Sequence, residues 1–197
     1  EKILEANPGQ DAGAGIAPHA GWYFSGRLAW DTVRRARADA ETVVVVGGHR
    51  PAGAAVLLAE EEAFRTPLGN LEADRDMARA LSARMPTQPD VWVDNTVEVL
   101  LPLVKLRFPK ARLLWLRVPN DEGAEGVGDA VARVTAELGR KIFFLASTDL
   151  THYGPNYDFS PHGSGAAACE LVRNVNDRRI LESFLAMDAK ETIQRGN

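Results

Sequence analysis

The sequence predicts an α/β fold: a single three-layer domain with a mostly parallel central sheet and helices on both faces. Three observations lead to this prediction. Short β-branched or apolar runs alternate with longer segments of helical periodicity, which is the pattern of repeated βαβ units. The strongest run, residues 42–46, is almost wholly β-branched and suits a strand buried on both sides. No linker interrupts the 197 residues, so we expect one domain over residues 1–197.

The expected strands are short segments rich in β-branched or large apolar side chains. The first follows a small, glycine-rich stretch near the start of the chain, and the last two are the apolar runs on either side of the expected helix at residues 122–138. The expected strands lie at or next to residues 11–16, 42–46, 54–58, 112–118 and 141–146.

The expected helices fall between these strands. Ser25 is expected to cap the first helix, Pro102 to kink the third, and Gly139 to end the fourth. The last helical segment follows Gly163 and is expected to break near Asn176-Asp177. The helices are expected at residues 27–38, 71–84, 96–108, 122–138 and 164–197.

Composition and charge exclude several classes of partner. The net charge of −4 is spread over interspersed residues of both signs, with no basic footprint, so we do not expect a nucleic-acid partner. No apolar run approaches the roughly 18 residues of a spanning helix, so we expect no membrane segment. Cys169 is the only cysteine, which excludes an intrachain disulfide and favours the cytoplasm. The chain starts on a charged stretch and stops at Asn197. We expect that both ends are cropped from a longer protein.

Three of the four histidines follow three different expected strands. His19, His49 and His152 each come shortly after an apolar run, whereas His162 lies in a polar Pro/Gly loop typical of a surface residue. Open α/β sheets bind ligands at the carboxyl ends of their strands, so the first three are expected to share one crevice. Histidine is the commonest metal ligand and also titrates near neutral pH. The pattern therefore indicates a metal or acid–base site, without naming the metal.

Five short motifs resemble those of the MEMO family, in the family's order. The first, PHAGWYFSG, is similar to its PHAGY-x-YSG signature, and the last, STDLTHYG, is similar to its SSDFSHYG turn. The other three resemble its GPSH turn, its TPLG segment and its EVQLPFL helix. The family includes the B component of the bacterial AmmeMemoRadiSam system. The motifs lie at residues 18–26, 47–49, 66–69, 98–102 and 147–154.

This resemblance implies a LigB-like fold, related to the class III extradiol ring-cleavage dioxygenases. It implies that His19 and His49 are metal ligands and that Asp149 and His152 line the same pocket. The third ligand of the family is a cysteine, which we expect beyond Asn197 in this chain. Cys169 lies in an alanine-rich helical context instead, where we expect a buried structural thiol.

The chain departs from the family pattern beside two of these motifs. Gly48 stands where the family often has proline, and Arg50 stands where it often has a second histidine. The helix motif commonly begins Glu-His-Ser, where this chain has Asp94-Asn95-Thr96. An auxiliary ligand or proton-transfer group at position 95 is therefore in doubt, and Arg50 is expected to pair with an anionic substrate group or with a nearby carboxylate.

The implied chemistry is that of a non-haem Fe(II) site, in which two histidines and a carboxylate hold the iron. Asp149 and Glu98 are the candidate carboxylates, although Asp149 can instead orient a histidine and Glu98 can form a salt bridge. His152 is the candidate general base and acid. A thiolate as third ligand would suit Zn or Cu equally well. The remaining candidates for the substrate pocket are Trp22, Tyr23, Arg50 and Tyr153.

Three functions stay open at this point. The first is an O₂-dependent oxidation of a small aromatic or related substrate. The second is a non-catalytic protein that binds a metal, a peptide or a partner in the same pocket. The third is a zinc hydrolase, which the absence of an HExxH motif makes less favoured. A radical-SAM protein is the expected pathway partner if the AmmeMemoRadiSam resemblance extends to function.

Overall fold

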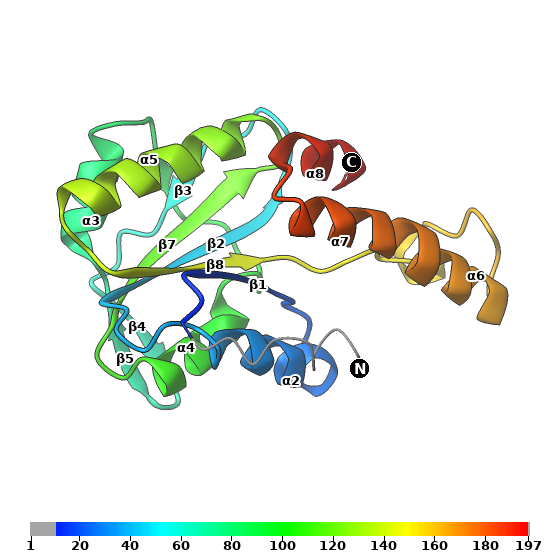
Figure 1. Ribbon diagram of the computed structural model, residues 1–197, viewed down its shortest axis with the longest axis horizontal. Coiled ribbons are helices and arrows are strands. Elements are labelled where there is room, and N and C mark those ends of the chain that lie inside the picture. The colour runs from blue at the N-terminus through cyan, green and yellow to red at the C-terminus, as the bar shows by residue number, and fades with distance from the viewer. Residues whose placement is uncertain (1–10, 197) are drawn as a thin grey trace.

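The computed structural model describes residues 11–196 and has helices on both faces of a central sheet (Figure 1). The sheet has six strands in the order β1-β8-β2-β7-β3-β6. Neighbouring strands pair in parallel except β3 and β7, which are antiparallel. This arrangement confirms the predicted α/β fold class. The strands are β1 (Ala14–Ala17), β2 (Thr42–Arg50), β3 (Leu57–Leu58), β6 (Gln88–Pro89), β7 (Arg112–Pro119) and β8 (Ile142–Ser147).

Two apolar clusters pack on opposite faces of the sheet, because successive side chains of the buried strands point to opposite sides. Val43 and Val45 face the cluster that contains α2 and α4, whereas Val44 faces the cluster that contains α3 and α5. All three side chains are fully buried, as expected for a strand covered on both faces. The helices are α2 (Trp22–Val33), α3 (Arg75–Ser82), α4 (Leu101–Arg107) and α5 (Gly123–Glu137).

A two-stranded hairpin precedes α3 and was not expected from the sequence. Strand β4 (Ala63–Thr66) pairs antiparallel with β5 (Gly69–Glu72), and the TPLG segment forms the turn. The Thr66 hydroxyl donates to the Gly69 carbonyl at 2.7 Å, which closes the turn. The helix expected from residue 71 therefore starts later, after Asp74, whose carboxylate accepts from the Met77 amide at 3.1 Å.

The roles expected of Ser25 and Pro102 are both wrong. Helix α2 begins at Trp22 after Gly21, so Ser25 lies inside the helix, where its hydroxyl donates to the Ala20 carbonyl at 2.8 Å. Pro102 does not kink a helix, because a 3₁₀ turn, η1 (Glu98–Leu100), comes first and Pro102 falls in the first turn of α4. Proline is tolerated there, since those amides have no intrahelical acceptor.

Helix α5 and its end at Gly139, with φ 61°, match the prediction.

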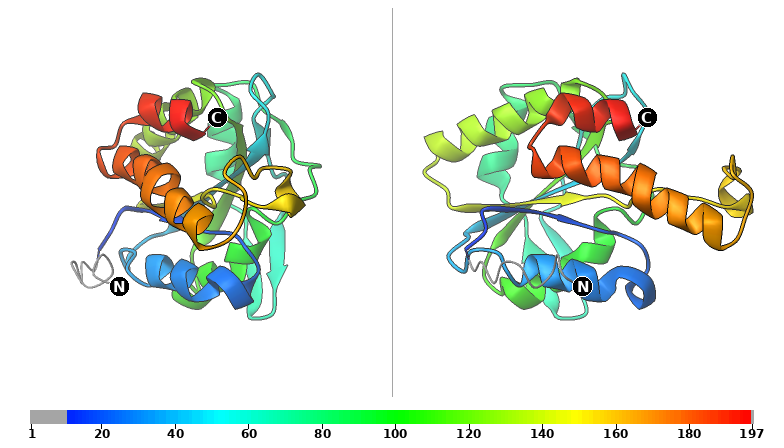
Figure 2. Two further views of the ribbon diagram at one scale, coloured as in Figure 1. Left: turned by 90° about the vertical axis from the view of Figure 1, so that its right-hand side faces the viewer. Right: turned by 45° about the vertical axis from the view of Figure 1, so that its right-hand side comes forward.

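The C-terminal helices form an arm that begins beyond the sheet at α6 and runs back toward it through α7, with α8 folded beside α7 (Figures 1 and 2). The expected break near Asp177 is instead a π-helical stretch inside one continuous helix. Cys169 is exposed, so the expectation of a buried thiol is wrong: α6 projects away from the core, and Ala168 is the residue of that helix that is buried. The arm comprises α6 (Ala166–Leu171), η3 (Val172–Asp177), α7 (Arg178–Leu185) and α8 (Ala189–Gly196).

Across residues 11–196, the helices fall short of the combination of length and apolarity that a membrane span requires.

Candidate metal centre

His19 lies two residues beyond β1 and is held by its backbone. Its amide donates to Asp149 Oδ1 at 2.8 Å, and its carbonyl accepts from the Asn95 side-chain amide at 2.9 Å. His19 is 4% exposed, whereas histidines in proteins are on average only partly buried. Asp149 lies two residues beyond β8, and β1 and β8 are parallel neighbours. The carboxyl ends of these two strands therefore bring the two residues together, as expected for an open α/β sheet.

The hydrogen bonds around His19 identify its tautomer. His19 Nδ1 lies 2.9 Å from Ser147 Oγ, and the Ser147 hydroxyl donates its single proton to the Thr96 carbonyl. Ser147 Oγ must therefore accept from His19, so the proton of the neutral imidazole is on Nδ1. The lone pair is then on Nε2, which is buried and makes no hydrogen bond with residues 11–196. A buried nitrogen with a free lone pair is the form of histidine that binds metals.

The electrostatic surroundings keep His19 neutral. Burial lowers the pKa of His19 below its ordinary value and outweighs the opposing effect of Asp149. Positive charge on His49 or His152 would lower it further, whereas Asp94 raises it. A neutral imidazole is required of a metal ligand, so burial and tautomer favour the same state.

We expect the free energy of unfolding to fall as the pH is lowered from about 7 to about 5, with His19 responsible for part of the fall. The pKa of His19 is lower in the folded chain than its ordinary value, so the unfolded chain takes up the proton first. Stabilisation by neutral His19 is complete above about pH 6.5 and is lost as the pH falls through the folded-state pKa. Urea unfolding of the wild type and of His19→Asn measures this effect. Equal pH slopes for the two proteins would contradict it.

His49 lies next to His19 at an irregular end of β2. The two ring centroids are 5.0 Å apart, with the rings edge to face at 86°. The pairing of β2 with β7 shifts register between Gly47 and Arg50, and His49 itself has φ 58°. A left-handed conformation costs a non-glycine residue free energy, and such strain concentrates at functional sites. The bulge places the His49 imidazole beside His19, where a regular strand would alternate its side chains across the sheet.

Asp94 lies beside His49 and is a functional candidate that the sequence did not reveal. Asp94 Oδ2 is buried, makes no hydrogen bond with the described residues and lies 3.9 Å from His49 Nδ1. Burial alone would raise the pKa of Asp94, but hydrogen bonds from Thr96 and the adjacent Arg117 guanidinium hold it below the ordinary value. The carboxylate therefore stays charged beside the His49 ring.

Asp149 also lies between two histidines. Asp149 Oδ2 is 3.8 Å from His19 Nε2 and 3.6 Å from His152 Nε2, so both nitrogens face one carboxylate oxygen without hydrogen-bonding to it. The His152 side chain is 46% exposed and packs on Tyr157 with the ring centroids 4.8 Å apart. The structure thus brings His19, His49, His152 and Asp149 into one cluster, with His152 on its open side.

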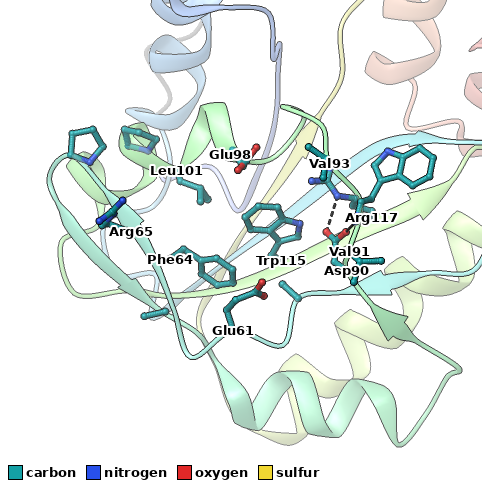
Figure 3. A pocket seen from close by; sticks show the side chains of 15 residues that line it. Glu61, Phe64, Arg65, Asp90, Val91, Val93, Glu98, Leu101, Trp115 and Arg117 are labelled. Atoms are coloured by element: carbon teal, nitrogen blue, oxygen red, sulfur yellow. Dashed lines mark hydrogen bonds and ion pairs between the residues drawn. The ribbon is translucent and has the colours of Figure 1, made fainter.

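The other sequence candidates lie outside this cluster. Trp22 donates its indole N–H to the Val99 carbonyl at 2.8 Å, and Tyr23 is 94% exposed. The Arg50 guanidinium lies 4.6 Å from the centre of the Trp92 ring. Glu98 lines a separate cavity (Figure 3).

The loop after His152 is closed by Tyr153. The Tyr153 hydroxyl donates to the Gly163 carbonyl and accepts from the His162 amide, both at 3.0 Å. Tyr153 therefore has a structural role in this loop, and His162 contributes its backbone.

The donor groups fit a metal in part. His19 and His49 are adjacent, and His19 Nε2 is buried with its lone pair free. Within residues 11–196, no set of three or more His, Cys, Asp and Glu side chains is arranged to hold a metal ion. The cysteine expected as third ligand would follow Asn197, outside the described residues. The two histidines are thus the candidate ligands that this part of the chain supplies.

Comparisons with known proteins identify the family of this chain. A family model described as "Memo-like protein" matches residues 1–195. A MEMO1 family protein of Thermococcus onnurineus (strain NA1) is 33% identical over 193 residues, which cover 90% of this chain and 65% of that relative. A MEMO1 family protein of Methanopyrus kandleri is 31% identical, over 91% of this chain and 62% of the relative. The chain thus spans somewhat less than two thirds of the length of these relatives, and it belongs to the MEMO family.

Proposed function

We propose that this MEMO-family chain binds a divalent transition metal, Fe(II) in the first place, through His19 and His49, and oxidises a small aromatic or related substrate with O₂. The observation that carries the proposal is the buried Nε2 of His19, with its lone pair free and His49 beside it. Leaving such an atom without a partner costs free energy, so its presence supports a ligand at this position. Bound Fe(II) would supply open coordination positions for substrate and O₂.

The residues around the two ligands each have a distinct role in this proposal. Ser147 fixes the tautomer of His19, and Asp94 supplies a negative charge beside His49. His152 is half exposed beside Asp149, where its Nε2 can take a proton from a substrate hydroxyl and later return it. Asp149 holds the His19 backbone through Oδ1 and faces both imidazoles through Oδ2. The chain therefore offers separate groups for metal binding and for proton transfer.

The proposed compartment and partners follow from the proposed Fe(II) chemistry. We place the protein in the cytoplasm, because Fe(II) is stable under reducing conditions, and the single cysteine of these 197 residues fits such a compartment. The proposed partners are a small-molecule substrate or a peptide in the pocket and a radical-SAM protein of the same pathway.

Oxygen uptake by the Fe(II)-loaded protein with a panel of catechols tests this function. We expect uptake that depends on substrate, and we expect His152→Gln to lower the rate by about a hundredfold while leaving bound iron unchanged, since general acid–base catalysis is lost. His162→Gln is the matched control, because His162 is exposed and its hydrogen bond to Tyr153 is made by the backbone amide. Metal binding without oxygen uptake would favour a non-catalytic protein. Hydrolytic activity of a zinc-loaded sample without O₂ would favour a zinc hydrolase.

A further inference from the structure

A cavity of about 580 Å³ opens beside the β4–β5 hairpin, apart from the candidate metal centre (Figure 3). Its walls come from the hairpin, the segment 90–93, the start of α4 and strand β7. None of the four histidines lines it. The volume falls within the usual range of small-molecule sites, about 300–1,000 Å³.

The wall of the cavity is aromatic and contains an unused hydrogen-bond donor. The rings of Phe64 and Trp115 lie 5.1 Å apart, tilted by 30°, and Trp92 lines the cavity as well. Trp115 Nε1 is buried and has no hydrogen-bond partner within residues 11–196. Buried polar atoms are rarely left unpaired, so this N–H supports an acceptor supplied by a ligand. The cavity thus suits a flat apolar body that carries an oxygen.

The free charges of the cavity are mainly negative. Arg117 and Asp90 neutralise each other, with Nε and Oδ2 2.7 Å apart and both side chains buried. The side-chain carboxylates of Glu61 and Glu98 make no ion pair or hydrogen bond with the described residues, and Arg65 supplies the opposing charge. In Figure 3 the two glutamates lie on either side of Trp115, whereas Arg65 lies farther to the left, beyond Phe64.

We propose that this cavity binds a small organic ammonium ion. Its apolar or aromatic body packs on Phe64 and Trp115, its cationic head lies between Glu61 and Glu98, and an oxygen of the ligand accepts from Trp115 Nε1. Charge complementarity favours a cation, because the cavity has two free carboxylates, Glu61 and Glu98, and one free guanidinium, Arg65. The ring faces of Phe64 and Trp115 also attract a cation. The guanidinium of Arg117, 5.3 Å from the centre of the Trp115 ring, does not oppose it, because Asp90 neutralises that charge.

Three aromatic probes of nearly equal size test the proposal: tyramine, a cation; tyrosol, its neutral alcohol; and hydroxyphenylacetate, an anion. Binding is followed by NMR through the indole N–H signal of Trp115, assigned by its loss in Trp115→Phe. A chelator keeps the sample free of metal, so the result does not depend on the proposed metal function. We expect tyramine to shift this signal and to bind about tenfold more tightly than tyrosol, with hydroxyphenylacetate weaker still.

Single substitutions separate the carboxylates from the apolar wall. We expect Glu61→Gln and Glu98→Gln each to weaken tyramine binding by about two- to fivefold and to leave tyrosol binding unchanged, since exposed ion pairs are individually weak. Glu125→Gln on α5 is the matched control and should change neither. An unchanged melting temperature shows that the variants are folded. No shift with tyramine, equal binding of tyramine and tyrosol, or tighter binding of the anion would each overturn the proposal.

Discussion

Replacing Arg117 by methionine is expected to lower the free energy of unfolding by about 3–5 kcal/mol. Arg117 is 1% exposed, and its guanidinium forms ion pairs with Asp90 and Asp94. It also donates to Thr96 Oγ1 at 2.5 Å. Methionine fills a similar space but leaves two carboxylates in a largely buried position without a counter-charge. Urea unfolding at neutral pH measures the loss.

Two further variants show whether the missing counter-charge is the cause. Arg117→Met combined with Asp90→Asn should recover part of the lost stability, because one of the uncompensated charges is removed. Arg79→Met is the control for an exposed pair: Arg79 and Asp76 are 2.7 Å apart with largely exposed side chains, so the change should stay below about 1 kcal/mol. A loss in Arg117→Met no greater than in Arg79→Met would contradict this account of the buried network.

Gly47→Ala is expected to destabilise the chain by about 1–3 kcal/mol through overpacking. A Cβ atom at position 47 would lie 2.5 Å from Thr96 Oγ1 and 2.6 Å from Val97 Cγ2. Thr96 and Val97 are both fully buried, so neither side chain has free space to move into. The substitution would also displace Thr96, whose carbonyl accepts a hydrogen bond from the Ser147 hydroxyl. That hydrogen bond leaves Ser147 Oγ as an acceptor for His19 Nδ1 and so fixes the tautomer of His19.

The neighbouring glycine provides the control. A Cβ atom at Gly48 would have no other atom within 4 Å, so Gly48→Ala should change the stability little. Thermal and urea unfolding of the two alanine variants, side by side, measure the difference. Equal stabilities would show that segment 94–97 can move away from β2 at no cost, and would remove the steric requirement for a glycine at position 47.

The fold class could be predicted from the sequence because the buried strands have a clear local signal. Residues 42–46 are continuous and β-branched, and they form the first five residues of β2. The β4–β5 hairpin had no such signal: its strands are four residues each, and they alternate exposed and buried positions weakly. The hairpin is stabilised by the pairing of β4 with β5 and by the hydrogen bond of Thr66 in the turn. These contacts join separate residues, so the composition of a single segment does not reveal them.

The histidine cluster could be predicted in outline but not in detail. His19, His49 and His152 all follow strands, which indicated a shared crevice at the sheet edge. The polar groups beside them could not be found in the same way, since Ser147 contacts His19 across 128 positions of sequence and Asp94 reaches His49 from a loop. The signals in the sequence were the motifs themselves: Ser147 opens STDLTHYG, and Asp94 precedes the EVLLP segment.

The metal content of the anaerobically purified, Fe(II)-reconstituted protein tests the central claim most directly. The wild type and His162→Ala are predicted to bind iron in near-stoichiometric amounts, whereas His19→Ala/His49→Ala should bind almost none while remaining folded. His162 is a suitable control because its side chain is exposed and lies outside the cluster. Equal iron in all three proteins, or no bound Fe(II), Zn or Cu in the wild type, would contradict the assignment of His19 and His49 as ligands.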